Sequence, residues 1–221
     1  MAYLLPILAG FTLGCVHAFD ADHLVAVTSF ASKSSSARSA ATFGFLWGLG
    51  HTSTLVVLGL LSIAFRFIIP PVVESVAEIL VGVLLVAIGA WVLGEVFQRN
   101  RLHIHKHTHD GVEHLHLHSH ATEESHRHRH SMFLVGATHG FAGTAPVMVI
   151  IPIAMTQSLG VAALYLLLFG VGTIVAMSFF ACAVGRLTQR LDSSHTLPIF
   201  QTASGVLSIC VGLIWIGQKV L

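Results

Sequence analysis

Four residues with the chemistry of metal ligands lie within seven positions of the chain: His17, Asp20, Asp22 and His23. Apolar residues flank them on both sides, so the group falls inside a stretch that otherwise reads as a membrane-spanning helix. Each ionisable group placed in hydrocarbon costs roughly 2.5–3.5 kcal/mol, and such groups are kept only where they face a partner, a cavity or an ion. Imidazole and carboxylate together suit a divalent transition metal. The segment therefore predicts that the protein handles a metal ion inside a bilayer.

The spacing of these residues predicts which of them share a face. His17, Asp20 and His23 recur every three positions and would form one stripe on a regular helix. Asp22 points away from that stripe if the helix is regular, and could then orient a ligand histidine through its other ring nitrogen. A local unwinding of the helix would instead bring Asp22 to the ion.

One helix cannot complete a coordination sphere, so other helices must supply ligands. The candidates are His51 and His139, each in a later apolar stretch. For His51 alone, a hydrogen bond to a neighbouring helix is an equally open interpretation. Hydroxyl groups that could line the same cavity belong to Thr52, Ser53, Thr54 and Thr144.

The helix that carries His139 is predicted to be broken or kinked. Positions 140–145 are rich in small residues, and Pro146 and Pro152 follow. Proline removes a backbone donor, and irregular backbone at membrane depth is tolerated where it lines a cavity. Close helix packing through the small residues is the simpler alternative.

The composition places the chain among integral membrane proteins. It has 221 residues, of which 54% are hydrophobic and 10% are charged, whereas soluble domains are about 25% charged. A net charge of +1 gives no reason to expect nucleic-acid binding. The three cysteines form no CxxC pair, so a disulfide framework or thiol-redox motif is not expected. We expect no enzyme activity, because no nucleophile motif is present, and we expect no prosthetic group.

The sequence predicts an all-α fold with six transmembrane helices. Six apolar windows are long enough to span a bilayer, at about 3–29, 41–65, 73–97, 132–157, 160–184 and 197–218. A polar segment separates the third window from the fourth. The predicted units are a first three-helix repeat, a His-rich loop and a second three-helix repeat, at 1–97, 98–131 and 132–221.

The two halves of the chain resemble each other in register. At an offset of 122, one half places Phe11, Gly14, His17 and Phe19 on Phe133, Gly136, His139 and Phe141. An offset of 123 places Gly82, Gly89 and Gly94 on Gly205, Gly212 and Gly217. A repeat of three spans must cross the membrane in the opposite sense the second time. The sequence thus predicts a 3+3 inverted repeat, the plan of many secondary transporters, with the site near the midplane.

Basic residues predict the orientation. One side of the predicted topology holds nine of them, Lys33, Arg38, Arg99, Arg101, Lys106, Arg127, Arg129, Arg186 and Arg190. The other side holds two, Arg66 and Lys219. The positive-inside rule places the first side in the cytoplasm. We therefore expect a multi-pass protein of the cell membrane, with both termini outside and the His-rich loop inside.

Residues 103–130 hold eleven of the sixteen histidines, mostly in His-x-His alternation. They are His103, His105, His107, His109, His114, His116, His118, His120, His126, His128 and His130. Imidazoles at this density bind borderline divalent ions weakly and at many sites. With little apolar mass, the segment is expected to be disordered without metal. It is interpreted as a metal-collecting, buffering or sensing loop, the alternative being a soluble linker.

Three motifs resemble those of the nickel/cobalt transporter family (NiCoT). Residues 17–23, HAFDADH, have the form HxxxxDH of the family signature. Residues 49–53, LGHTS, and 136–145, GATHGFAGTA, are similar to its second motif and to its histidine-glycine motif. The resemblance implies that four residues select the metal, namely His17, Asp22, His23 and His51. It also implies that the signature helix runs from outside to inside, the direction that the basic residues predict independently.

The chain departs from that family in two respects. Full-length importers usually have eight spans, so the six predicted here resemble the short branch associated with urease accessory genes. A His-rich cytoplasmic loop is also found in nickel/cobalt exporters. These carry Glu-Pro-Gly-His where this chain has Asp20-Ala-Asp22-His23. The resemblance favours uptake and leaves efflux by proton antiport as the alternative.

The function predicted from the sequence is secondary transport of Ni²⁺ through the bilayer, with Co²⁺ as a second candidate cargo. No GxxxxGK[ST] motif occurs, so the drive would come from ion gradients or membrane potential. Proteins that mature nickel enzymes are possible partners. Two other classes stay open: a membrane-anchored metal store or sensor, and a haem protein with His51 and His139 as axial ligands. The oligomeric state is open as well, since the small-residue faces of the third and sixth windows could pair within or between chains.

Overall fold

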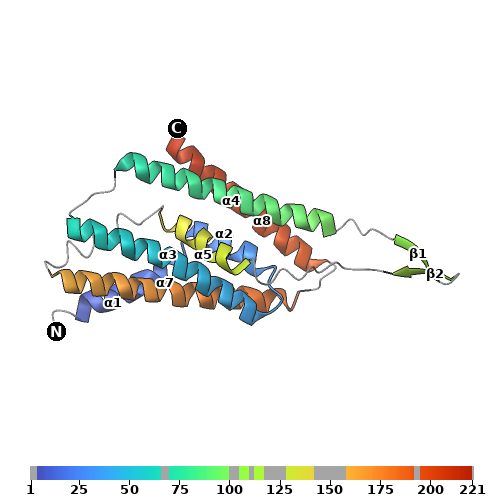
Figure 1. Cartoon of the computed structure of the whole chain (residues 1–221), viewed down its shortest axis with the longest axis horizontal. Coiled ribbons are helices and arrows are strands. Elements are labelled where there is room, and N and C mark those ends of the chain that lie inside the picture. The colour runs from blue at the N-terminus through green and yellow to red at the C-terminus, as the bar shows by residue number, and fades with distance from the viewer. Residues whose placement is uncertain are drawn as a thin grey trace.

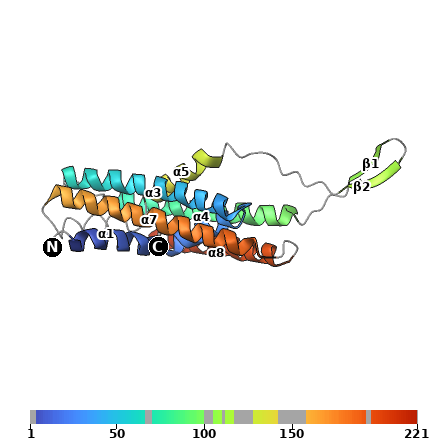
Figure 2. The ribbon, with the colours of Figure 1, turned by 90° about the horizontal axis from the view of Figure 1, so that it is seen from below.

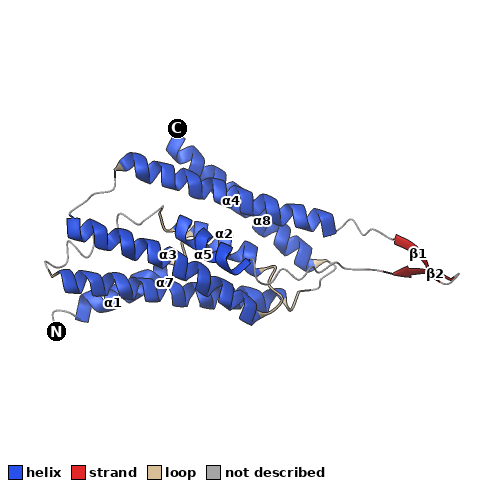
Figure 3. Ribbon diagram, in the orientation of Figure 1, coloured by secondary structure: helices blue, strands red, loops and turns tan. Residues whose placement is uncertain are grey.

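A computed structural model describes residues 4–65, 70–99, 105–109, 112–116, 128–141, 158–191 and 195–220. Figure 3 shows that these residues are almost entirely helical. The helices of the first half are α1 (Leu4–His17), α2 (Ala21–Ala31), α3 (Ala37–Phe65) and α4 (Pro71–Arg99). Two strands follow, β1 (His105–His109) and β2 (Val112–His116). The remaining helices are α5 (His128–His139), α7 (Leu159–Thr188) and α8 (Thr196–Val220).

The protein is an integral membrane protein. Within the described residues, four helices are long and apolar enough to cross a bilayer: α3, α4, α7 and α8, with spans of 26, 28, 30 and 25 residues. Each exceeds the roughly 20 residues that a spanning helix needs. Large apolar side chains stay exposed on their outer faces, among them Val83, Leu167, Phe179 and Leu213. Such a surface suits contact with lipid.

The first apolar window is not one continuous helix. Helix α1 ends at His17 and α2 begins at Ala21. The amides of Phe19 and Asp20 donate to carbonyls three residues back, a tighter turn than the α-helix has, at 2.9 and 3.0 Å. Asp20 then takes an extended backbone, with ψ at 147°, as the N-cap of α2. The prediction of a regular stripe through His17, Asp20 and His23 is therefore wrong, because the helix breaks between the first two.

The fourth window can be followed only in part. Helix α5 ends at His139, and a turn occupies Gly140 and Phe141. The helix thus stops where the sequence predicts a break. Residues 142–157, with Thr144, Pro146 and Pro152, lie outside the described residues.

The long helices form two antiparallel pairs. Helices α3 and α7 pack along their length, and so do α4 and α8, while the colours of Figure 1 show each pair running in opposite directions. Helix α1 lies against α7, and α5 lies against α3. Helix α2 contacts α3, α4, α7 and α8, so it joins the two pairs (Figure 1). Figure 2 places the start of α1 and the end of α8 away from the β-hairpin, which extends from the other end.

Glycine brings the helices of the two halves into contact at corresponding positions. A Cβ on Gly14 would collide with the carbonyl of Phe169, and one on Gly136 would collide with that of Trp47. Gly136 follows Gly14 by 122 positions, and Phe169 follows Trp47 by the same number. The α1·α7 contact therefore repeats, residue for residue, in the α5·α3 contact.

The contact between α4 and α8 also joins corresponding positions of the two halves, here at the predicted offset of 123. Gly82 meets Gly212, and Gly89 meets Gly205, each at a backbone carbonyl. A shift of 123 positions converts the first contact into the second. The small-residue faces of these two helices thus pair within one chain.

The expectation of disorder in the His-rich segment is wrong for two of its stretches. Strands β1 and β2 form an antiparallel hairpin with His105 opposite His116 and His107 opposite His114. The His-x-His alternation matches the two-residue period of a strand. Asp and Gly stand between the strands in the sequence, a pair typical of two-residue hairpin turns. The other histidines of 103–126 lie outside the described residues.

Candidate metal centre

Five side chains with metal-binding chemistry gather in the interior, at the break between α1 and α2. His17, Asp22, His23, His51 and His139 are all buried, with exposed fractions of 6, 6, 1, 1 and 1%. They come from four helices, α1, α2, α3 and α5. Because α1 and α5 both end at their histidine, the centre lies where two half-length helices stop. The structure thus brings together five of the six predicted residues.

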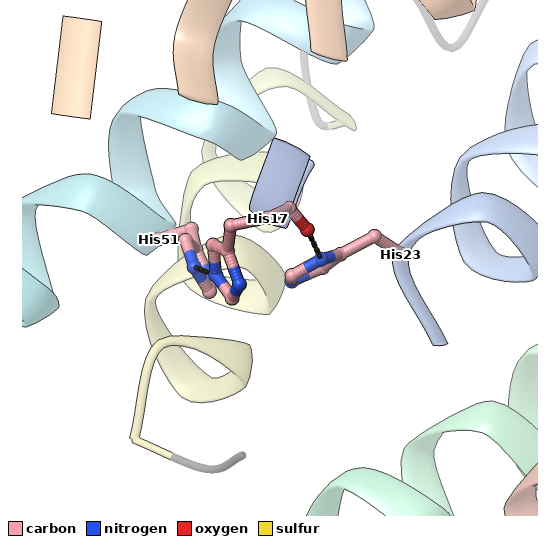
Figure 4. Close-up of side chains that lie close together, drawn as sticks. All are labelled: His17, His23 and His51. Carbon is pink, nitrogen blue, oxygen red and sulfur yellow. Dashed lines mark hydrogen bonds between the residues drawn. The ribbon is translucent and has the colours of Figure 1, made fainter. Parts of the chain in front are cut away.

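His17 and His51 face each other across the α1–α3 boundary. The Nε2 atoms of the two rings are 3.0 Å apart. The other nitrogen of His17, Nδ1, lies 2.9 Å from a carboxylate oxygen of Asp20, to which it donates. Asp20 therefore fixes the ring of His17 so that its Nε2 can offer a lone pair. Figure 4 shows the rings of His17 and His51 side by side, with His23 beside them.

His23 has one nitrogen occupied and one available. Its Nδ1 donates to the backbone carbonyl of His17 at 3.0 Å (Figure 4). The same carbonyl also accepts the amide of Asp20 in the turn that follows α1. The Nε2 of His23 is buried and has no hydrogen-bond partner among the described residues. A buried, unpaired acceptor is costly to leave empty, which makes this nitrogen the clearest ligand position of the centre.

The positions of Asp20 and Asp22 are the reverse of those expected from a regular helix: Asp22 faces the centre, and Asp20 lies at its edge. A carboxylate oxygen of Asp22 lies 2.8 Å from His139 Nε2, and both side chains are buried. The side chain of Asp20 is 40% exposed and contacts the centre only through His17. The local unwinding at residues 18–20 turns Asp22 inward. Of the two arrangements that the sequence allows, the structure has the unwound one.

The ligand atoms form two overlapping groups. One consists of His17, His23 and His51, and the other of Asp22, His23 and His139. Within each group, the ligand atoms lie within 4.8 Å of one another. Both groups are fully buried, and both contain His23.

Aromatic rings close the centre on two sides. Phe169 lies 5.3 Å from His17 between ring centroids, and Trp47 lies 5.6 Å from His139. Trp47 and Phe169 occupy corresponding positions of the two halves. Both are about 1% exposed or less. They shield the ligands from lipid and bulk water, which strengthens electrostatic interactions inside the centre.

The hydroxyl groups that the sequence placed in the same cavity have other partners. Thr52 donates to the carbonyl of Gly170 at 3.3 Å, and Thr54 donates to that of Ala137 at 3.0 Å. Ser53 bonds back to its own helix at Leu49. These residues therefore join helices and shape the α3 backbone, and Thr144 lies outside the described residues.

Sequence reasoning missed a polar contact between α2 and its neighbours. Lys33, just after α2, lies 2.9 Å from Glu95 of α4 and 3.4 Å from the ring centre of Trp91. Gln201 of α8 donates to the carbonyl of Ser32 at 3.0 Å. Burial lowers the pKa of Lys33, and Glu95 partly offsets that effect. A cavity of 290 Å³ lies here. The available signal was a glutamate inside the predicted third span.

The chain matches a protein family over nearly its full length. Residues 9–214 match the family described as the transmembrane region of cytochrome c biogenesis protein. The urease accessory protein UreH of Bacillus sp. (strain TB-90) is 33% identical over 95% of this chain and 90% of its own length.

The chain belongs to this family of membrane proteins, with UreH as a relative. The predicted likeness to a short, urease-accessory-type branch is thereby confirmed. Two Arabidopsis thaliana relatives are named chloroplast proteins FOR GROWTH AND FERTILITY 1 and 2, at 27 and 26% identity over 82 and 92% of this chain. The chain spans 50 and 54% of their lengths. No solved structure matches it.

Proposed function

We propose that the protein is a secondary transporter that carries Ni²⁺, and Co²⁺ as a chemically similar cargo, through the membrane into the cytoplasm. One observation carries the proposal: five buried histidine and aspartate side chains from four helices converge where α1 is interrupted. Burying ionisable groups within a membrane costs free energy, and such groups typically mark ion pathways. UreH is named as a urease accessory protein, which accords with a metal-supply role.

The donor set of the centre suits Ni²⁺ and Co²⁺, and imidazole and carboxylate also bind Zn²⁺. The His17–His51 pair is 3.0 Å apart, and the Asp22–His139 pair is 2.8 Å apart. These are hydrogen-bond distances, so an ion that binds here would replace both hydrogen bonds. The choice of Ni²⁺ rests on residues 17–23 and 49–53, which resemble the motifs of nickel/cobalt transporters.

We further propose six transmembrane segments arranged as a 3+3 inverted repeat. Helices α1 and α2 form the first segment, and α5 belongs to the fourth. The corresponding glycine contacts of the two halves support this plan, as does the antiparallel course of α3 and α7. An interrupted helix in each half, with the site between them, is typical of such transporters.

In the orientation that we propose, the end of the bundle that carries the β-hairpin faces the cytoplasm, and both termini face outward. The excess of basic residues on the hairpin side supports that assignment. An inside-negative potential then drives uptake, since a doubly charged ion gains roughly 4.6 kcal/mol per 100 mV. The His-rich segment would receive released ions and pass them to proteins that mature nickel enzymes.

The test is metal flux into proteoliposomes. We would compare Ni²⁺, Co²⁺ and Zn²⁺ under an inside-negative potential and then under a pH gradient, in the wild type and in His23→Ala. His195→Ala is the matched control, because His195 is exposed and lies outside the centre. We expect potential-driven Ni²⁺ entry that His23→Ala abolishes and His195→Ala retains. Flux that requires an opposing proton gradient would indicate efflux, and no flux at all would favour a metal store or sensor.

A further inference from the structure

The two ligand groups share His23 and no other residue. We propose that the ion occupies two overlapping sites in turn, and passes between them by exchanging its other ligands while His23 stays bound. The outer members are His17 and His51 in the first site, and Asp22 and His139 in the second. This inference rests on the proposed transport function and describes how the same centre would carry it out.

The hydrogen bonding of His23 prevents both sites from being filled together. Its Nδ1 donates to the carbonyl of His17, so only Nε2 keeps a lone pair. One lone pair binds one ion. Each group needs that nitrogen as its third ligand, so an ion in one site deprives the other of it.

The position of the shared ring suits an exchange of partners. The ring centre of His23 lies 4.8 Å from that of His51 and 4.8 Å from that of His139. His51 and His139 are themselves 6.0 Å apart. An ion held by His23 can therefore reach either neighbour with a small displacement, without leaving the buried interior.

Each site has one outer ligand at the end of a half-helix, and these two half-helices enter from opposite ends of the bundle (Figure 1). His17 is the last residue of α1, and His139 is the last residue of α5. By the correspondence of the two halves, each helix stops at the same relative depth from its own end. The first site is thus built on the half-helix from the terminal side, and the second on the half-helix from the hairpin side (Figure 1). A transfer across His23 moves the ion from one to the other.

The two sites should differ in affinity because they differ in charge. The first offers three imidazoles and leaves the dipositive charge uncompensated, apart from the half-exposed Asp20. The second contains the buried carboxylate of Asp22. Opposite charges attract more strongly in a low-dielectric interior, so the second site should bind the ion more tightly.

The experiment measures Ni²⁺ binding by calorimetry, and Ni²⁺ flux, on chains in which a short Gly/Ser linker replaces residues 103–130, so that the His-rich segment adds no ions to the count. The chain with this linker and an intact centre serves as the wild type for these measurements. His51→Ala removes an outer ligand of the first site, His139→Ala removes one of the second, and His23→Ala removes the shared ligand. We expect one ion per wild-type chain. Each outer variant should still bind one ion, with the weaker affinity in His139→Ala, while its flux falls at least about tenfold. The double variant and His23→Ala should not bind.

Glutamine versions of both outer variants nearly keep the side-chain volume of histidine and guard against loss of folding, which gel filtration monitors. Bound Co²⁺ supplies a second readout, because its visible absorption should differ between the nitrogen-only site and the site with a carboxylate. Two ions per wild-type chain would overturn the proposal. Loss of all binding in both single outer variants would indicate one undivided site and overturn it too. Failure of the transport function itself would look different, since the wild type would then show no flux.

Discussion

The protein concentrates histidine in two regions that are built in opposite ways. The buried centre draws five ligand residues from four helices, and the first and last of them, His17 and His139, lie far apart in the sequence. The His-rich segment, residues 103–130, holds eleven histidines close together in the sequence. Its described parts are a short hairpin that stands apart from the helices (Figures 1 and 2) and the first residues of α5.

The difference shows that selective metal binding requires ligands held in a fixed arrangement. In the centre, helix packing fixes the distances between ligand atoms before an ion arrives, and the low dielectric strengthens every interaction. In the segment, ligand density replaces fixed geometry, so binding depends on local concentration. We therefore expect the centre to fail when distant packing is disturbed, and the segment to tolerate large changes.

The largest effect should come from a residue that is not a ligand. Gly136→Val would place a side chain against the carbonyl of Trp47 and push α5 away from α3, which would carry His139 out of the centre. Overpacking of this kind costs about 1–3 kcal/mol or more. We expect flux to be lost and thermal stability to fall, as measured in proteoliposomes and by unfolding in detergent. Gly94→Val is the control, since a Cβ there meets nothing within 4 Å; equal damage in both would contradict the packing argument.

A matched pair of carboxylates separates contact with the ion from positioning of a ligand. Asp22→Asn removes the one buried carboxylate that the described residues place in the centre, and it leaves His139 with an amide. Removing one partner of a buried, hydrogen-bonded charge pair costs about 2–5 kcal/mol of binding free energy, so Ni²⁺ affinity should fall by about a hundredfold. Asp20→Asn should cost only about tenfold, because Asp20 is half exposed and acts through His17. The measurement is Ni²⁺ affinity and flux in each variant. A larger effect at Asp20 would mean that the helix is regular and that the stripe predicted from spacing is correct.

These two aspartates also mark the limit of what the sequence predicts. The residue types, the apolar windows and the internal repeat are visible in the sequence, because composition and period carry them. The exchange of Asp20 and Asp22 is not, since it depends on where the helix unwinds. The shared position of His23 depends on packing between α2, α3 and α5. Lys33 and Glu95 were missed because nothing in the sequence shows that α2 ends beside α4.

The role of the His-rich segment can be tested by its removal. Deletion of residues 103–130, replaced by a short Gly/Ser linker, should leave flux at saturating Ni²⁺ close to that of the wild type. At low Ni²⁺, the rate of delivery to a cytoplasmic acceptor should fall by up to about tenfold, as expected when local concentration is lost. The measurement is flux against Ni²⁺ concentration, with a chelator trapped inside the vesicles. Complete loss of flux at every Ni²⁺ concentration would show that the protein's function depends on the His-rich segment. That result would favour a metal store or sensor.

The smallest effect should come from the contact that links the two regions. Lys33 and Glu95 join α2, which carries two ligands, to the end of α4, from which the His-rich segment departs. Burial lowers the pKa of Lys33, so the unfolded chain holds this proton more tightly than the folded one. Between the lowered pKa and the ordinary lysine value of about 10.4, stability should therefore rise with pH. Lys33→Met keeps the apolar stem over Trp91 and should remove that rise, while Ni²⁺ affinity changes little. Thermal unfolding of both proteins from neutral to alkaline pH measures the difference, and a large fall in Ni²⁺ affinity would show instead that this contact holds the centre in place.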